Sequence, residues 1–226
     1  MVLILLGGVV FAIFKYQLEQ HLQVERFRTK LSSNLHDEVS GLLSGIAMQT
    51  DVLQILVKDE ISQKRIKSIG EVSRKAMSKM SDVIWSIDSR KDRIEDFINR
   101  MQEHADDILV PLNIRYDLHI GQIDMAQKIP VGIRQDLYFI YKESINNVAK
   151  HSNASRVNIE LGNVGYFFEM LIKDNGDADS KSKMKGSSFK GQGISNLKMR
   201  AKRIQADLII KNDRGYTVQL KMKKFT

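Results

Sequence analysis

The chain has 226 residues and contains no cysteine, which excludes a disulfide framework and a thiolate metal site, and its length suits two modest domains. Its formal net charge of +8 is compatible with nucleic-acid binding. However, the basic residues are spread over the predicted helices and one polar segment, with no interleaved aromatic residues, so we expect charge that faces ATP and a membrane, and no direct nucleic-acid binding.

Residues 2–14 form an uncharged apolar run, and basic residues follow from Lys15 onward. A helix that spans a bilayer takes about 20 apolar residues. We therefore expect residues 1–15 to be the last part of a transmembrane helix that is truncated at its start, continued by a connector helix over residues 16–30. The basic C-terminal flank predicts a protein of the inner (cytoplasmic) membrane whose following domains lie in the cytoplasm. A signal peptide is disfavoured, because no basic segment precedes the run and no small-residue cleavage site follows it.

Residues 27–56 have the three-and-four spacing of a helix that packs against other helices. His36 lies beside this seam, where its imidazole can meet solvent and a partner, and Asp37 follows at once to orient or deprotonate the ring. A nucleophilic histidine needs both features, although most single histidines on helices are ordinary surface or partly buried residues. The seam consists of Leu35, Val39, Leu42, Ile46, Gln49, Leu53 and Leu56.

A second helix with the same spacing follows a turn predicted at residues 59–63. Two antiparallel helices cannot bury both stripes by themselves, so we expect a homodimer in which two helical hairpins form a four-helix bundle. The second stripe consists of Ile66, Ile69, Val72, Ala76, Met80, Val83 and Ile87.

The remainder of the chain predicts three helices and five strands. A capping box of Asp92 with Glu95 begins a helix that Pro111 closes. Alternating or β-branched runs predict strands over residues 113–120, 156–161, 166–173, 207–211 and 216–222. The predicted fold is therefore α+β: the helical hairpin, then helices on one face of a largely antiparallel sheet. The stripe of the first of these helices is Ile94, Phe97, Ile98, Met101, Ala105 and Ile108.

The helix that begins near Asp136 carries polar residues opposite its buried stripe. Glu143 and Asn147 lie one turn apart, and their oxygens suit a hydrated Mg²⁺ that also binds the phosphates of a nucleotide. Lys150 and His151 follow on or near the same face. A plain solvated face would have the same composition. The buried stripe is predicted to be Leu137, Ile140, Tyr141, Ser144 and Val148.

Two glycine-bearing segments complete the set of candidate ligand-binding residues. Asp174 precedes Asn175 and Gly176 at the end of a strand, where a carboxylate can accept a hydrogen bond from the exocyclic amine of adenine, although such a sequence is more often merely a turn. Gly191 and Gly193 precede a helix whose N–H groups can approach a phosphate. Between these two segments, the polar residues 177–190 suit a mobile lid.

In this order, the segments resemble those of bacterial two-component sensor histidine kinases, in the subfamily whose phosphoacceptor box reads Leu-His-Asp. Leu35-His36-Asp37 resembles that box, residues 143–151 the N box, and residues 174–176 and 191–201 the two glycine boxes. The resemblance implies a dimerisation and phosphotransfer domain over residues 31–90 and an ATP-binding catalytic domain over residues 91–226. The latter would be the sandwich shared with gyrase, Hsp90 and MutL.

The resemblance also implies a reaction. His36 would be the phosphoacceptor, with Asp37 and Glu143 assisting, and the phosphoryl group would pass to an aspartate on the receiver domain of a response regulator. ATP would be bound by Asn147, Lys150, His151, Asp174, Gly176, Gly191 and Gly193, with Mg²⁺ on Asn147 and Glu143. The alternatives are a membrane-tethered nucleotide-binding scaffold and an ATPase of the same fold that forms no phosphohistidine.

Two positions depart from the family pattern. Gly41 stands where members with strong phosphatase activity carry a glutamine, so we expect a poor phosphatase. A glycine within a helix also suggests a close helix approach or a flexible point beside His36. Asp177 stands where the first glycine box usually has its second glycine, which predicts a different lid geometry.

Overall fold

A computed structural model describes residues 2–176, 190–212 and 215–225 and divides the chain into two compact units, residues 1–91 and 92–226. The predicted lid, including Asp177, lies outside the described residues except for Lys190, its last residue, which is helical. Each unit is considered by itself below.

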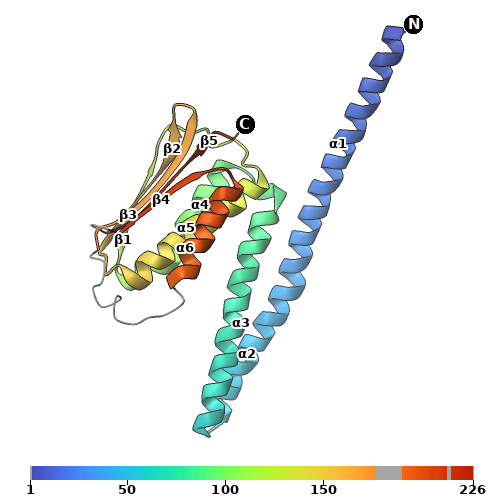
Figure 1. The fold of residues 1–226 in the computed structure, drawn as a ribbon. Coiled ribbons are helices and arrows are strands. Elements are labelled where there is room, and N and C mark those ends of the chain that lie inside the picture. Colours follow the sequence, from blue (N-terminus) through green and yellow to red (C-terminus); the bar gives the residue numbers. More distant parts are fainter. Residues whose placement is uncertain (1, 177–189, 213–214, 226) are drawn as a thin grey trace. The chain divides into compact units, whose positions relative to one another are not determined.

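The first unit is helical (Figure 1). Helix α1 (Val2–Asn34), the π-helical turn η1 (Leu35–Val39) and helix α2 (Ser40–Leu56) form one continuous rod, as predicted, except that the π-helical turn was not foreseen. Helix α3 (Glu60–Ile87) runs back along α2. The predicted turn at residues 59–63 was wrong in its extent. The side chain of Asp59 accepts a hydrogen bond from the backbone N–H of Ser62 and caps α3, so the helix begins one residue later, at Glu60.

Most of the predicted seam residues on α2, and several residues of the second stripe on α3, are exposed within the single chain. Leu42 and Leu53 on α2 are 70% and 44% exposed, and Val72 on α3 is 64% exposed. The contact between α2 and α3 instead uses smaller residues, among them Ala47, Thr50, Gly70 and Ser73. Each hairpin therefore has an outer apolar face, which is the kind of surface that a second copy of the chain would bury.

The second unit begins after a short 3₁₀ turn, η2 (Ser89–Lys91). Its first helix, α4 (Ile94–Leu109), has Arg93 as N-cap, and the Asp96 carboxylate accepts a hydrogen bond from the Arg93 N–H at 3.4 Å. The predicted capping box of Asp92 and Glu95 was therefore one residue out of register. The helix ends before Pro111, in the 3₁₀ turn η3 (Val110–Leu112), and its last fully buried position is Leu109, not the predicted Ile108.

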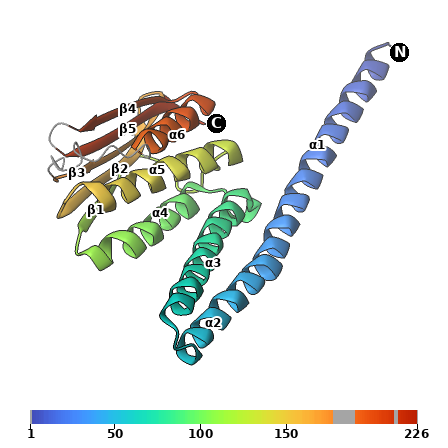
Figure 2. The ribbon, with the colours of Figure 1, turned by 60° about the horizontal axis from the view of Figure 1, so that its bottom comes forward.

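Five strands form one sheet in the order β1-β2-β3-β5-β4. Only the pair β1–β2 is parallel, so the sheet is largely antiparallel, as predicted. Helices α4, α5 (Val131–His151) and α6 (Lys190–Arg203) cover one face of it (Figure 2). The strands are β1 (Arg115–Ile120), β2 (Arg156–Val164), β3 (Phe167–Asp174), β4 (Asp207–Asn212) and β5 (Tyr216–Lys223).

The core of this unit lies between the sheet and its helices. Every member of the predicted α5 stripe is at most 1% exposed, and the inward-facing side chains of β2, β3 and β5 meet this layer. Burial at about 25 cal/mol per Å² makes such a layer the main source of stability. It also fixes the rotation of α5 about its own axis, which determines where the polar face of the helix points.

Candidate functional site

His36 lies in the π-helical turn η1 and is exposed to solvent. Asp37 is also exposed, and its Oδ2 atom accepts a hydrogen bond from the Ser33 hydroxyl at 3.4 Å. Turns of this type are rare, occur mostly as single bulges within α-helices and are frequent at functional sites. Both groups are therefore accessible to a reaction partner, and Asp37 is held by the preceding helical turn.

The N-box residues Glu143 and Asn147 lie on α5 beside its buried stripe. Ser144, on the buried side, donates a hydrogen bond to the Ile140 carbonyl at 2.8 Å and is fully buried. Glu143 and Asn147 are partly exposed, and Asn147 Nδ2 donates to the hydroxyl of Tyr216 on β5 at 3.1 Å. Lys150 and His151 lie in the last turn of the same helix, and both are exposed.

Asp174 ends β3 in a tightly packed position, 2% exposed. Its Oδ1 atom accepts a hydrogen bond from the Gly176 N–H at 2.7 Å. A Cβ atom at Gly176 would lie 1.8 Å from the Ser152 carbonyl oxygen, and one at Gly215, whose φ is +92°, would lie 2.2 Å from the Asp174 carbonyl oxygen. Both positions therefore require glycine.

The second carboxylate oxygen of Asp174 is the notable atom of this site. Oδ2 is buried and has no hydrogen-bond partner among the described residues. Burial raises the pKa of the carboxyl, against the opposing effect of hydrogen bonds from the Gly176 and Tyr216 N–H groups and from the Ser152 side chain. A buried acceptor without a partner is costly, and an exocyclic amine that donates to it would remove that cost. The residues present thus fit an adenine base.

Helix α6 brings the second glycine box to the N box. A Cβ atom at Gly193 would lie 2.7 Å from Glu143 Oε1, so the absence of a side chain lets the two helices approach. The prediction that Gly191 and Gly193 precede the helix was wrong, because α6 begins at Lys190 and both glycines lie in its first turn. That turn still has N–H groups with no partner within the helix, which suit a phosphate.

Sequence reasoning missed an ion-pair cluster that joins α5 to α6. Asp136 is 2% exposed and accepts hydrogen bonds from Arg200 at 2.8 Å and from Arg203 Nε at 2.9 Å. Arg200 also lies over the ring of Phe139, 4.3 Å from its centroid. The cluster holds the first turns of α5 against the last turn of α6, and a charged residue at a buried helix position was the available signal.

A metal site is not apparent from carboxylates and histidines alone. Among the described residues, no three His, Cys, Asp or Glu side chains converge. This is compatible with Mg²⁺ chemistry, because that ion usually keeps several waters and is held by one or two protein oxygens together with substrate phosphates. Asn147 Oδ1 and the Glu143 carboxylate are the oxygens that would hold it.

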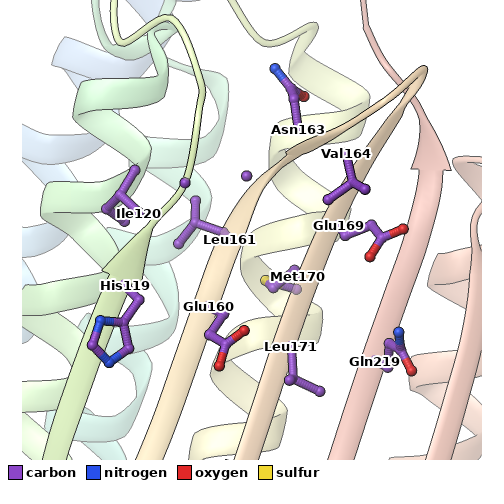
Figure 3. Close-up of a pocket in the computed structure, with 12 residues that line it drawn as sticks. His119, Ile120, Glu160, Leu161, Asn163, Val164, Glu169, Met170, Leu171 and Gln219 are labelled. Atoms are coloured by element: carbon purple, nitrogen blue, oxygen red, sulfur yellow. The ribbon is translucent and has the colours of Figure 1, made fainter.

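Two cavities lie apart from the predicted site residues. One of about 460 Å³ lies along β1, β2, β3 and β5, lined by His119, Glu160, Glu169 and Gln219 among others (Figure 3). The other, of about 720 Å³, lies near Pro130, Arg203 and Phe225. Neither contains a residue that the sequence analysis assigned to nucleotide binding.

One helix among the described residues, the rod over residues 6–56, is long and apolar enough in part to cross a membrane, by length and composition alone. The apolar side chains at its N-terminal end, such as Val10 and Phe14, are exposed within the chain.

The sequence and the structure are both similar to those of known proteins. Residues 28–92 match the family model HisKA_3, described as histidine kinase. The sensor histidine kinase LiaS of Bacillus subtilis is 26% identical, over 88% of this chain and 54% of its own length. The histidine-protein kinase/phosphatase DegS of Brevibacillus brevis is 23% identical, over 83% of this chain and 48% of its own length. The chain thus spans about half the length of these curated relatives.

Among solved structures, the Acinetobacter baumannii histidine kinase AdeS has a similar fold, with a TM-score of 0.50 and 14% identity over 81% of this chain and 93% of that one. The matched segment at residues 28–92 contains His36, and the relatives extend the similarity through the sheet. Residues 28–92 thus match the histidine kinase family model, and the chain is similar to sensor histidine kinases over most of its length.

Proposed function

We propose that this chain is the kinase portion of a two-component sensor: it phosphorylates His36 with the γ-phosphoryl group of ATP and passes that group to an aspartate of a response regulator. The observation that carries the proposal is the presence, in one chain, of an exposed His-Asp pair on a helical hairpin and of a buried Asp174 carboxylate oxygen in the second unit that has no hydrogen-bond partner in the part of the chain that the structure describes.

In this reaction the protein mainly aligns the attacking and leaving groups and neutralises charge on the phosphates. One ring nitrogen of His36 attacks the γ-phosphorus, the bond between that phosphorus and the β,γ-bridging oxygen breaks, and ADP leaves. Asp37 would hold the proton on the other ring nitrogen, so that the attacking nitrogen presents its lone pair. Bound Mg²⁺ would neutralise charge on the phosphates.

The nucleotide would be held by residues of the second unit. Asp174 Oδ2 would accept a hydrogen bond from the adenine amine, and the first turn of α6, with Gly191 and Gly193, would face the phosphates. Asn147 and Glu143 would hold the cation, and Lys150 and His151 would add positive or donor groups at the end of α5.

The exposed apolar stripes on α2 and α3 support a homodimer as the working form. The apolar N-terminal segment supports attachment to the cytoplasmic membrane, with the kinase portion in the cytoplasm. The name of the relative DegS includes phosphatase activity. We expect that activity to be weak in this chain, because Gly41 offers no side chain that could position a water molecule.

Incubation with labelled ATP tests the proposal directly. We expect label that is stable in base and labile in acid, as phosphohistidine is, and no label on His36→Gln. The matched control is His119→Gln, since His119 is also an exposed histidine but lies on β1. Label that persists on His36→Gln would make the phosphoacceptor assignment wrong. Hydrolysis of ATP without any phosphohistidine would favour the ATPase alternative, and nucleotide binding without either reaction would favour the scaffold.

Asn147 provides a second, independent test. Asn147→Ala should reduce autophosphorylation by orders of magnitude, because the metal neutralises charge that builds up in the transition state. Circular dichroism should show that the variant folds, because Asn147 is not part of the buried stripe. Turnover close to that of the unaltered protein would place the metal elsewhere.

A further inference from the structure

Tyr216 is the first residue of β5 and lies outside every motif of the sequence analysis. Its hydroxyl accepts the hydrogen bond that Asn147 Nδ2 donates at 3.1 Å. The same hydroxyl is within hydrogen-bond reach of Ser144 and lies near the charges of Glu143 and Asp174. One phenol therefore stands among the residues proposed to hold the metal and the adenine base.

The direction of these hydrogen bonds is set by the helix backbone. The carbonyl of Ile140 can only accept, so the Ser144 hydroxyl donates to it, at 2.8 Å. The oxygens of Ser144 and Tyr216 also lie within hydrogen-bond reach of each other. The phenol oxygen has lone pairs that can accept, and it accepts from Asn147 Nδ2 at 3.1 Å. Because burial raises the pKa of Tyr216 above its usual value of 10.0, the phenol retains its hydrogen at neutral pH.

This chain of hydrogen bonds orients the Asn147 amide. An asparagine side chain has a donor nitrogen on one side and an acceptor oxygen on the other. With Nδ2 held by the phenol, Oδ1 is turned away from Tyr216 and is available as an oxygen ligand. In the flipped orientation, the amide nitrogen would take the ligand position, and an N–H group cannot bind a cation.

We infer that Tyr216 is a positioning residue, which holds the Asn147 amide with its oxygen toward the divalent cation of a bound metal–nucleotide complex. The inference rests on the proposed function, because it assumes that Asn147 binds that cation. It adds to the proposal a residue of β5, opposite α5, that acts through Asn147.

Nucleotide binding tests this without reference to kinase activity. The full chain in detergent is titrated with a fluorescent ATP analogue in EDTA and then at increasing Mg²⁺ concentration. Tyr216→Phe removes only the hydroxyl. The loss of one net hydrogen bond of ordinary strength should raise the Mg²⁺ concentration for half-maximal enhancement of binding by about three- to tenfold. Binding in EDTA should change little.

Two further variants separate positioning from a structural effect. Tyr141→Phe is the matched control, since the Tyr141 hydroxyl donates to the Met101 carbonyl in the core at 2.7 Å. It should lower thermal stability and leave the Mg²⁺ dependence unchanged. In an Asn147→Asp background, Tyr216→Phe should have almost no effect on Mg²⁺ dependence, because a carboxylate presents an oxygen in either orientation.

The failures of the two proposals are distinguishable. If the unaltered chain shows Mg²⁺-dependent binding and Tyr216→Phe shows the same Mg²⁺ dependence, the positioning role is wrong and the proposed function stands. An equal effect of Tyr216→Phe in the unaltered chain and in the Asn147→Asp background would also overturn the inference, since the phenol would then act independently of the amide. If the unaltered chain binds no nucleotide, the proposed function itself fails.

Discussion

The guanidinium group of Arg28 donates two hydrogen bonds to the carbonyl oxygen of Ile87, 59 residues further along the chain, at 3.1 Å from Nε and 2.9 Å from Nη2. Ile87 is the last residue of α3, so its carbonyl has no partner within the helix. Thr29 and Ser89 add a hydroxyl pair at 2.7 Å. The last residues of the predicted connector helix are thus hydrogen-bonded to the C-terminal end of α3 and to the turn η2, which leads into the second unit.

Arg28→Ala should therefore loosen the end of α3 and the turn η2. Hydrogen bonds from a charged group contribute about 1.5–3 kcal/mol, less where the side chain is partly exposed, as here. We expect amide hydrogen exchange over residues 84–91 to become about tenfold faster. Arg26→Ala is the matched control, because it removes the same charge from an exposed position two residues away. Equal exchange rates in the two variants would show that the hydrogen bonds from Arg28 to Ile87 contribute no measurable stability.

A second prediction compares two helix glycines. No described atom outside the local helix backbone lies within 4 Å of a Cβ built at Gly41, so the close helix approach suggested by the sequence is not found within this chain. At Gly70, by contrast, a Cβ would lie 2.6 Å from Thr50 Oγ1. Gly41→Ala should raise stability by about 1 kcal/mol through helix propensity. Gly70→Ala should lower it by about 1–3 kcal/mol through overpacking.

Denaturant unfolding of the chain at fixed protein concentration measures both changes. The double variant Thr50→Ala with Gly70→Ala should recover much of the loss, because the clashing hydroxyl is gone. If Gly70→Ala is as stable as Gly41→Ala, then α3 moves away from α2 at little cost and the contact is not tightly packed.

The sequence was sufficient for the elements whose side chains repeat with a clear period. The α5 stripe was predicted correctly, and all five predicted strands are present with ends that differ by up to three residues. Burial selects apolar residues every third or fourth position in a helix, or every second one in a strand. The order of the strands and the parallel β1–β2 pair depend on contacts between distant segments and do not follow from periodicity.

The sequence was insufficient where one residue acts through a distant partner. Gly70 matters only because Thr50 lies opposite it, and Tyr216 only because Asn147 does. The π-helical turn at His36 adds no residue pattern of its own. The roles of Glu143, Asn147, Lys150, His151 and the glycines remain predictions. The structure brings Glu143 to Gly193, and among the described residues no donor pairs with Asp174 Oδ2.

Asp174 should show a conflict between binding and stability. Because burial raises its pKa above the usual 3.8, the folded state binds the proton more readily than the unfolded chain does. The stability linked to this group is therefore present at low pH and is lost as pH rises from about 3.8 through the raised folded value. Asp174→Asn removes the buried charge.

We accordingly expect Asp174→Asn to have a melting temperature at pH 7 at least equal to that of the unaltered chain, while binding of the fluorescent ATP analogue is lost. The difference in melting temperature should shrink as pH falls towards about 4. Asp177→Asn is a control for the loss of one acidic charge nearby in the sequence. A marked loss of stability in Asp174→Asn at pH 7 would show that the carboxylate is stabilised in the folded state by more than the observed contacts.

The last prediction concerns dephosphorylation of the response regulator. Gly41 lies at the second residue of α2, one helical turn beyond Asp37, and a side chain there would be placed to orient a water molecule for attack on a phosphoaspartate. The open space around Gly41 means that a glutamine can be introduced without a clash inside the chain. The unaltered protein should therefore dephosphorylate a labelled regulator little faster than the regulator does alone, and Gly41→Gln should raise the rate. Gly41→Ala, which strengthens the helix but adds no amide group, should not raise the rate.

Rapid dephosphorylation by the unaltered protein in the absence of ADP would mean that a neighbour, such as Asn34, Glu38 or Ser40, orients the water. An equal gain in Gly41→Ala and Gly41→Gln would instead assign the effect to the stiffness of the helix beside His36.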